Sequence, residues 1–174
     1  AAHAIAINIW LFTAFFVDGY GAAGNVLSGK LLGEKDYRSL WKLTKRVNLY
    51  NLAVAAILIG MGLLFYQPLG QLFNKDPEVL DIFYAMFFMV LLIQPLNAIA
   101  FTFDAIFNGL GEMGDLRNVL VGATLFGFLP TLYFAKYMDW GLIGIWSAIL
   151  VWVAYRAIAL LIKFKRKYIP LVEN

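Results

Sequence analysis

Cysteine is absent from this sequence of 174 residues, and histidine occurs only once. The absence of cysteine excludes disulfide bonds, thiolate nucleophiles and cysteine-ligated metal sites, and a single histidine gives little basis for any other metal site. Charged residues are scarce too, at 14% of the chain against about 25% in soluble domains. Because so few charges cannot cover a water-exposed surface, the composition excludes an ordinary soluble globule.

Hydrophobic residues make up 62% of the chain, with 15 Phe, 9 Tyr and 5 Trp, and the mean hydropathy is +0.75. A helix needs about 20 apolar residues to cross a bilayer, and five apolar stretches lie near or above that length. We therefore predict an all-α fold, a polytopic transmembrane bundle of five helices. The stretches cover residues 4–27, 47–66, 82–107, 119–135 and 142–162.

Local signals refine these five stretches. The fourth is the shortest, and Pro130 with two nearby glycines predicts a kink there, which membrane helices tolerate when neighbours satisfy the freed backbone groups. Asp76 followed by Pro77 has the chemistry of a helix start, so the third helix should begin at that point. Residues 37–46 alternate charged and apolar side chains, and they fit either a short interfacial helix or an extension of the second span.

The distribution of Lys and Arg predicts the orientation in the membrane, because these residues are retained on the cytoplasmic side. Twelve of the 14 lie after the first stretch, between the third and fourth stretches, or at the C-terminal end. The other two, Lys75 and Lys136, lie in the remaining connections. The pattern predicts a multi-pass membrane protein with a cytoplasmic C-terminus.

Two aspartates interrupt the apolar stretches well inside their spans. An acid near the bilayer centre costs about 2.5–3.5 kcal/mol, so Asp18 and Asp104 should face the bundle interior, a wet cavity or a partner. Asp18 shares its helical face with small residues and with Asn25, and Asp104 shares its face with Asn97 and Asn108. These faces fit a wall that contacts a solute or protons, and they also fit polar contacts that only hold helices together.

Arg156 is the one basic residue several turns inside a span. It could form a structural ion pair with an aspartate, or it could extend its side chain to the headgroups. Burial disfavours the charged form of an acid, so an unpaired aspartate could instead take up a proton during a conformational change. The sequence leaves these alternatives open.

Three stretches resemble one transporter family. They are AAHAIAINIWLFTAFFVDGYGAAGNVLSGKLLGEKDYR at residues 1–38, QPLNAIAFTFDAIFNGLGEMGDLRN at residues 94–118 and RAIALLIKFKRKYIP at residues 156–170. They are similar to the multidrug and toxic compound extrusion (MATE) transporters, and within these to the DinF-like branch. The resemblance implies a twelve-helix fold in two lobes, of which this chain is the C-terminal lobe, helices eight to twelve, without the first helix of that lobe. We therefore expect a piece of a longer protein.

The resemblance also implies a location, a prokaryotic inner membrane, and a function. MATE proteins export amphipathic or cationic organic compounds in exchange for protons or sodium ions by alternating access. The implied cleft residues are Asp18 and Asp104, with Asn25, Asn97 and Asn108 as polar contacts. Sodium-coupled NorM-like members carry a carboxylate near the position of Asn97, so this departure favours protons as the coupling ion.

Three other classes of function predict different features. A lipid-linked oligosaccharide flippase of the same superfamily should have a cationic cavity, whereas these faces carry acids. A structural membrane protein would hold both aspartates in fixed bonds. An enzyme is not expected, because no catalytic motif is present, and no cofactor, metal or nucleic-acid partner is indicated. The expected partners are a small amphipathic or cationic substrate, the lipid bilayer and the missing N-terminal lobe.

Overall fold

The computed structural model describes the backbone of residues 1–173 and the side chains of residues 1–172, and every regular element in this part of the chain is a helix. Five helical runs are long and apolar enough to cross a membrane, so the predicted all-α transmembrane fold is confirmed. Each predicted apolar stretch lies inside one of these runs, which extend past it at both ends. The elements are α1 (Ala2–Gly33), α2 (Tyr37–Phe73), α3 (Pro77–Gly109), α4 (Met113–Gly122), the π-helix η1 (Ala123–Phe128), α5 (Leu129–Tyr137), α6 (Gly141–Tyr168) and α7 (Pro170–Glu173).

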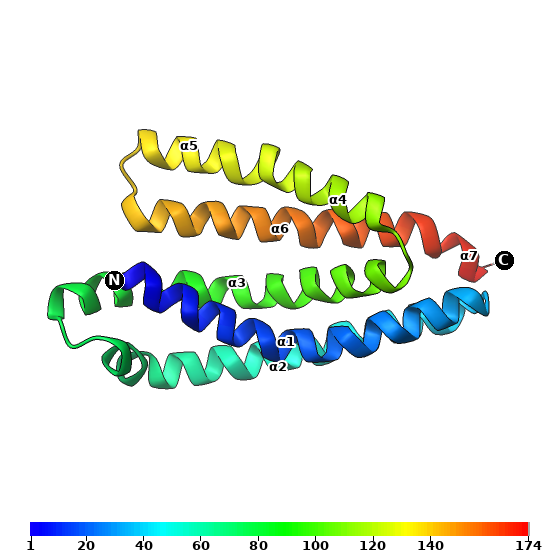
Figure 1. Cartoon of the computed structure of the whole chain (residues 1–174), viewed down its shortest axis with the longest axis horizontal. Helices are drawn as coiled ribbons and strands as arrows, with labels where there is room; N and C mark the ends of the chain where they lie inside the picture. The colour runs from blue at the N-terminus through cyan, green and yellow to red at the C-terminus, as the bar shows by residue number, and fades with distance from the viewer. Residues whose placement is uncertain (174) are drawn as a thin grey trace.

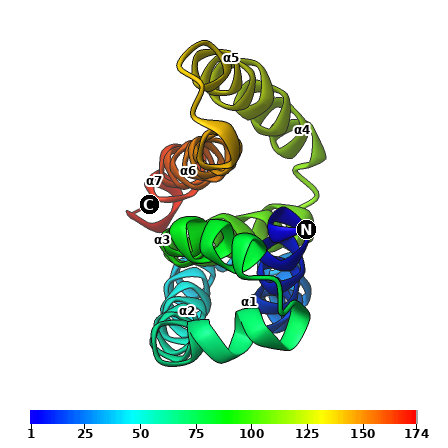
Figure 2. The same cartoon turned by 90° about the vertical axis from the view of Figure 1, so that its left-hand side faces the viewer.

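Helix α3 is the centre of the bundle. It packs against α1, α2 and α6, whereas the run from α4 to α5 packs along α6. Figure 2 shows the result from one end: α1, α2 and α3 form one group, and α4 and α5 lie on the far side of α6. Phe83, Phe103 and Phe107 of α3 are almost fully buried, which is consistent with this central position.

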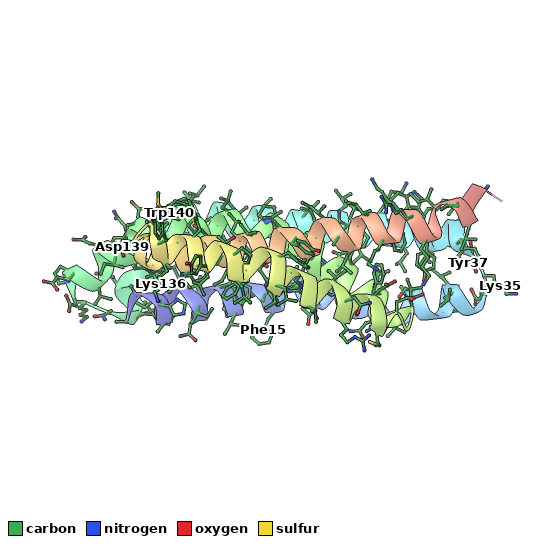
Figure 3. All side chains as sticks on the ribbon, turned by 90° about the horizontal axis from the view of Figure 1, so that it is seen from above. Phe15, Lys35, Tyr37, Lys136, Asp139 and Trp140 are labelled. Carbon is green, nitrogen blue, oxygen red and sulfur yellow. The ribbon has the colours of Figure 1, made fainter. Side chains whose placement is uncertain are left out.

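The two ends of the bundle differ in charge. The α1–α2 connection, the α3–α4 connection and the C-terminus lie at one end in Figure 1, and the other two connections lie at the opposite end. Figure 3 shows Lys35 and Tyr37 at the first end and Lys136 and Trp140 at the second. The segments that the sequence analysis grouped by charge are therefore grouped in space, and the basic end is also the end at which Lys163 pairs with Asp115 at 2.6 Å.

The starts of α2 and α3 are set by aspartate caps. The Asp36 carboxylate accepts a hydrogen bond of 2.9 Å from the amide of Ser39, and hydrogen bonding from Ser39 lowers the pKa of Asp36 below its ordinary value. Residues 37–46 form the first turns of α2, so the extension of the second span is the correct interpretation. The Asp76 carboxylate accepts from the amide of Glu78 with Pro77 in the first turn, which confirms the predicted start of the third helix.

A π-helix interrupts the fourth span where the sequence predicted a kink. The amide of Leu129 donates to the carbonyl of Thr124, five residues back. Pro130 follows at once and has no amide hydrogen to donate. π-Helical turns are rare and occur often at functional sites, and this one packs against α6.

Three helices end in the same hydrogen-bond pattern. In each, the residue after the C-cap has a left-handed backbone conformation. The amide of this residue and the amide of the residue after it donate to carbonyls in the last turn of the helix, and this pattern is a Schellman motif. Gly111 takes this position after α3 with a φ of 73°. Lys35 takes it after α1 with a φ of 58° and Asp139 after α5 with a φ of 53°, so two of the three ends place a side chain where glycine is preferred.

We expect Lys35→Gly to stabilise the full-length protein by about 1 kcal/mol or less, because the left-handed conformation costs a residue with a Cβ atom more than it costs glycine. Thermal unfolding in detergent would measure the change. Lys35→Ala is the matched control, since it removes the same charge but keeps the Cβ atom. If alanine raises the melting temperature as much as glycine does, the charge is responsible and the backbone explanation is wrong.

Candidate functional site

The two aspartates singled out in the sequence lie on one pocket between α1 and α3. Its volume is about 280 Å³, enough for a small group of atoms or several waters. Helix α1 supplies one wall and α3 the other, which follows from the close packing of these two helices. The lining residues are Asp18, Ala22, Asn25, Phe101, Asp104, Ala105 and Asn108.

Asp18 lies where this polar pocket meets an apolar one. A second pocket of about 230 Å³ is lined by Asp18 and Phe101 together with Leu11, Ala14 and Phe15. Asp18 is exposed, and it forms no ion pair with any side chain of residues 1–172. Phe15 is 77% exposed and extends away from the helices in Figure 3. A free carboxylate beside an aromatic, apolar hollow is a suitable environment for an organic cation.

Asp104 is in a different electrostatic state, because the guanidinium of Arg156 on α6 forms an ion pair with its carboxylate. Arg156 is buried, with 9% of its side chain exposed, against 23% for Asp104. The pair is thus formed at the inner wall of the pocket, and the structural ion pair considered in the sequence analysis is present. Extension of Arg156 to the headgroups is excluded by its burial.

Arg156 also stacks on an aromatic ring. Its guanidinium carbon lies 4.5 Å from the centre of the Trp152 ring, a cation–π geometry. The indole nitrogen of Trp152 in turn donates a hydrogen bond of 3.2 Å to the hydroxyl of Thr124, which lies in the π-helix. Asp104, Arg156, Trp152 and Thr124 therefore form a continuous contact path from the pocket to the irregular turn of the fourth span.

A tight crossing of α1 and α3 adjoins the pocket next to Asn25 and Asn108. A Cβ atom on Gly109 would lie 1.9 Å from the carbonyl oxygen of Asn25, and one on Gly29 would lie 2.8 Å from the carbonyl oxygen of Gly109. The hydroxyl of Ser28 donates across the same crossing to the carbonyl of Ile106 at 3.3 Å. Small residues permit this approach of two membrane helices. The backbones of α1 and α3 are therefore held close together beside the pocket.

Asn97 is placed differently from the other candidate residues. Its side chain is fully buried, it does not line the pocket, and neither polar atom of its amide has a hydrogen-bond partner in the described part of the protein. Asn25 and Asn108 do line the pocket. The structure thus brings together five of the six candidate residues, Arg156 among them through its ion pair, and leaves Asn97 about two turns away along α3.

Several polar residues that the sequence analysis did not select tie α3 to its neighbours. Gln94 donates to the hydroxyl of Thr13 on α1 at 2.9 Å, and Asn51 of α2 donates to the hydroxyl of Thr102 at 2.8 Å. All of these side chains are buried. The sequence did contain a signal for these residues, since each is a polar side chain inside an apolar stretch. Among the side chains of residues 1–172, no group of three or more His, Cys, Asp or Glu residues could hold a metal ion.

The fold and the pocket define a class: a polytopic helical membrane protein with an acid-lined pocket between two central helices. Comparison with known families gives a more specific result. The family model MatE matches residues 1–133, about three quarters of the chain. The chain belongs to the MatE family.

Similar curated proteins come from a plant and a bacterium. Protein DETOXIFICATION 42 of Arabidopsis thaliana is 30% identical over 160 residues, which covers 90% of this chain and 30% of that protein. Protein DETOXIFICATION 44, chloroplastic, of the same plant is 28% identical over 91% of this chain and 30% of its own length. The probable multidrug resistance protein NorM of Neisseria meningitidis is 26% identical over 92% of this chain and 35% of its own length. The chain thus spans about a third of the length of these relatives.

Proposed function

We propose that this chain is part of a transporter that exports amphipathic or cationic organic compounds from the cell. Membership of the MatE family and similarity to a protein named for multidrug resistance support export as the activity. The observation that carries the choice of substrate is the position of Asp18 on the border between a polar and an apolar pocket, where its carboxylate has no ion-pair partner among the described side chains. That border suits a molecule with one positive charge and an apolar body.

We place the chain in the DinF-like branch, as the C-terminal lobe that comprises helices eight to twelve of a twelve-helix protein. The three similar stretches from the sequence analysis support this placement, and the match over about a third of the relatives' length is compatible with it. The concentration of Lys and Arg at one end of the bundle supports a cytoplasmic C-terminus in the cell membrane.

The proposed mechanism is antiport by alternating access, with protons rather than sodium as the coupling ion. We assign Asp18 as the residue that binds either a proton or the cationic substrate, because no side chain of residues 1–172 forms an ion pair with it. Asp104 is neutralised by Arg156, so its role is to shape the wall and to fix the guanidinium. Asn25 and Asn108 lie on the same pocket and supply uncharged donors and acceptors for the polar end of the substrate.

We expect Asp18→Asn in the full-length protein to reduce efflux of a cationic dye by at least tenfold, because the variant keeps the size of the side chain but loses the charge. The measurement is dye efflux from proteoliposomes driven by a pH gradient and, in parallel, by a sodium gradient. Asp81→Asn is the matched control, since Asp81 is an exposed acid of α3 that does not line either pocket. It should transport at the parental rate.

Three results would decide the elements of this proposal separately. Parental efflux by a folded Asp18→Asn variant would refute the role of Asp18. Efflux driven by the sodium gradient alone would refute proton coupling. Absence of dye efflux from the unmodified full-length protein, reconstituted in folded form, would refute the cationic substrate class.

A further inference from the structure

A strongly basic surface lies on the first turns of α2, away from the candidate site. Arg38, Lys42, Lys45 and Arg46 are all exposed, and their spacing of four, seven and eight residues puts them on one face of the helix. The opposite face is buried against the bundle through Leu40, Thr44 and Val47. We call these four cations the basic face of α2.

The basic face has no acidic partner among the side chains of residues 1–172. The ion pairs of this part of the chain engage Lys30, Arg156, Lys163 and Lys167. Asp36 is near enough to sense Arg38 and Lys42, but its carboxylate caps the helix at Ser39. Four like charges within about three turns repel each other, and the positive end of the helix dipole adds to that repulsion. An anion from outside the chain would relieve both effects.

The same face of α2 becomes apolar directly after the cations. Leu49 is 63% exposed and Leu63 62% exposed, and Ala53 and Ala56 between them are also exposed. These four residues follow Arg38 at multiples of about one helical turn, so they continue its face along the helix. Along the helix, the surface therefore changes from cationic to apolar. A membrane leaflet shows a matching change, from polar headgroups to acyl chains.

We propose that the basic face of α2 binds the phosphate-bearing headgroup of an anionic phospholipid, whose acyl chains lie along the apolar strip that follows. The charge of the face is complementary to that of the headgroup, and Lys and Arg side chains can lay their apolar stems on the helix while their charged ends reach the phosphate. Lys45 already lies over the Trp41 ring at 5.2 Å, which positions it at the level of the interface. Clusters of this size next to a membrane span are typical of anionic lipid recognition.

The test uses the full-length protein in detergent and counts bound lipid by native mass spectrometry, with phosphatidylglycerol and phosphatidylcholine as the probes. We expect retention of phosphatidylglycerol but not of phosphatidylcholine. Lys42→Gln/Arg46→Gln should lose affinity for phosphatidylglycerol by about fivefold for each cation removed, hence by more than tenfold for the pair. Lys42→Arg should bind as the parent does.

The matched control is Lys75→Gln/Lys136→Gln, which removes two exposed cations at the opposite end of the bundle and should leave lipid binding unchanged. Equal retention of phosphatidylglycerol by Lys42→Gln/Arg46→Gln and by the parent would overturn the proposal, as would equal binding of the two lipids. Displacement of the lipid by millimolar inorganic phosphate would show a site for free phosphate instead. Cross-linking of this face to another protein segment would show that protein, not lipid, covers it.

Discussion

Arg156→Met is expected to destabilise the full-length protein by about 3–5 kcal/mol, the range found when one partner of a buried ion pair is removed. Methionine fills a similar volume, but it leaves the Asp104 carboxylate on the pocket wall without its counter-charge. It also ends the stacking on Trp152. The measurement is thermal unfolding in detergent, with the fraction of folded protein after extraction as a second readout.

The double variant Arg156→Met/Asp104→Asn separates the charge from the packing. If the loss arises from the unpaired carboxylate, the double variant should recover most of the stability, since a neutral amide needs no counter-charge. Arg156→Lys keeps the charge but cannot form the same planar stack on the Trp152 ring, so it should fall between the parent and Arg156→Met. An Arg156→Met protein as stable as the parent would contradict the pair's structural role.

Gly109→Ala is the second change with a large expected effect. The added Cβ atom would lie 1.9 Å from the carbonyl oxygen of Asn25 and 2.2 Å from the hydroxyl of Ser28. The first of these is backbone, which cannot move aside without separating α1 from α3. Overpacking typically costs about 1–3 kcal/mol, and we expect Gly109→Ala to lower the free energy of unfolding by at least the upper value of this range. Efflux should also fall, because Asn25 lies on the pocket.

Gly19→Ala is the control for this effect. Gly19 is in α1, one residue from Asp18, and nothing lies within 4 Å of the Cβ atom it would acquire. Because alanine has the higher helix propensity, this variant should be as stable as the parent or slightly more so. Thermal unfolding of the two variants side by side gives the comparison, and equal melting temperatures would show that the α1–α3 crossing is less tight than described.

The fold was predictable because the length of each apolar stretch can be determined from the sequence alone. Five spans and the start of α3 at Asp76 follow from local chemistry, without knowledge of which helices are neighbours. The partner of Arg156 was not predictable in this way. Whether Arg156 pairs with Asp104, pairs with Asp18 or extends to the headgroups depends on how α6 packs against α3. The spacing of residues within one helix does not reveal that packing.

The pocket was predictable in part for a similar reason. Helical periodicity put Asp18 with Asn25, and Asp104 with Asn108, and all four line the pocket. The same periodicity put Asn97 on that face, seven residues from Asp104. Periodicity gives the direction of a side chain but not what covers it, and α3 is covered by three other helices. Asn97 is accordingly buried although its direction was read from the same pattern.

The π-helix changes the rotational phase of the fourth span. Val119 and Ala135 are both buried, yet in an uninterrupted α-helix residues 16 positions apart would point about 160° away from each other. One extra residue in a π turn removes about 100° of that difference, which leaves the two side chains about 60° apart. The turn between Ala123 and Phe128 thus allows a single span to keep the same side against α6 along its whole length.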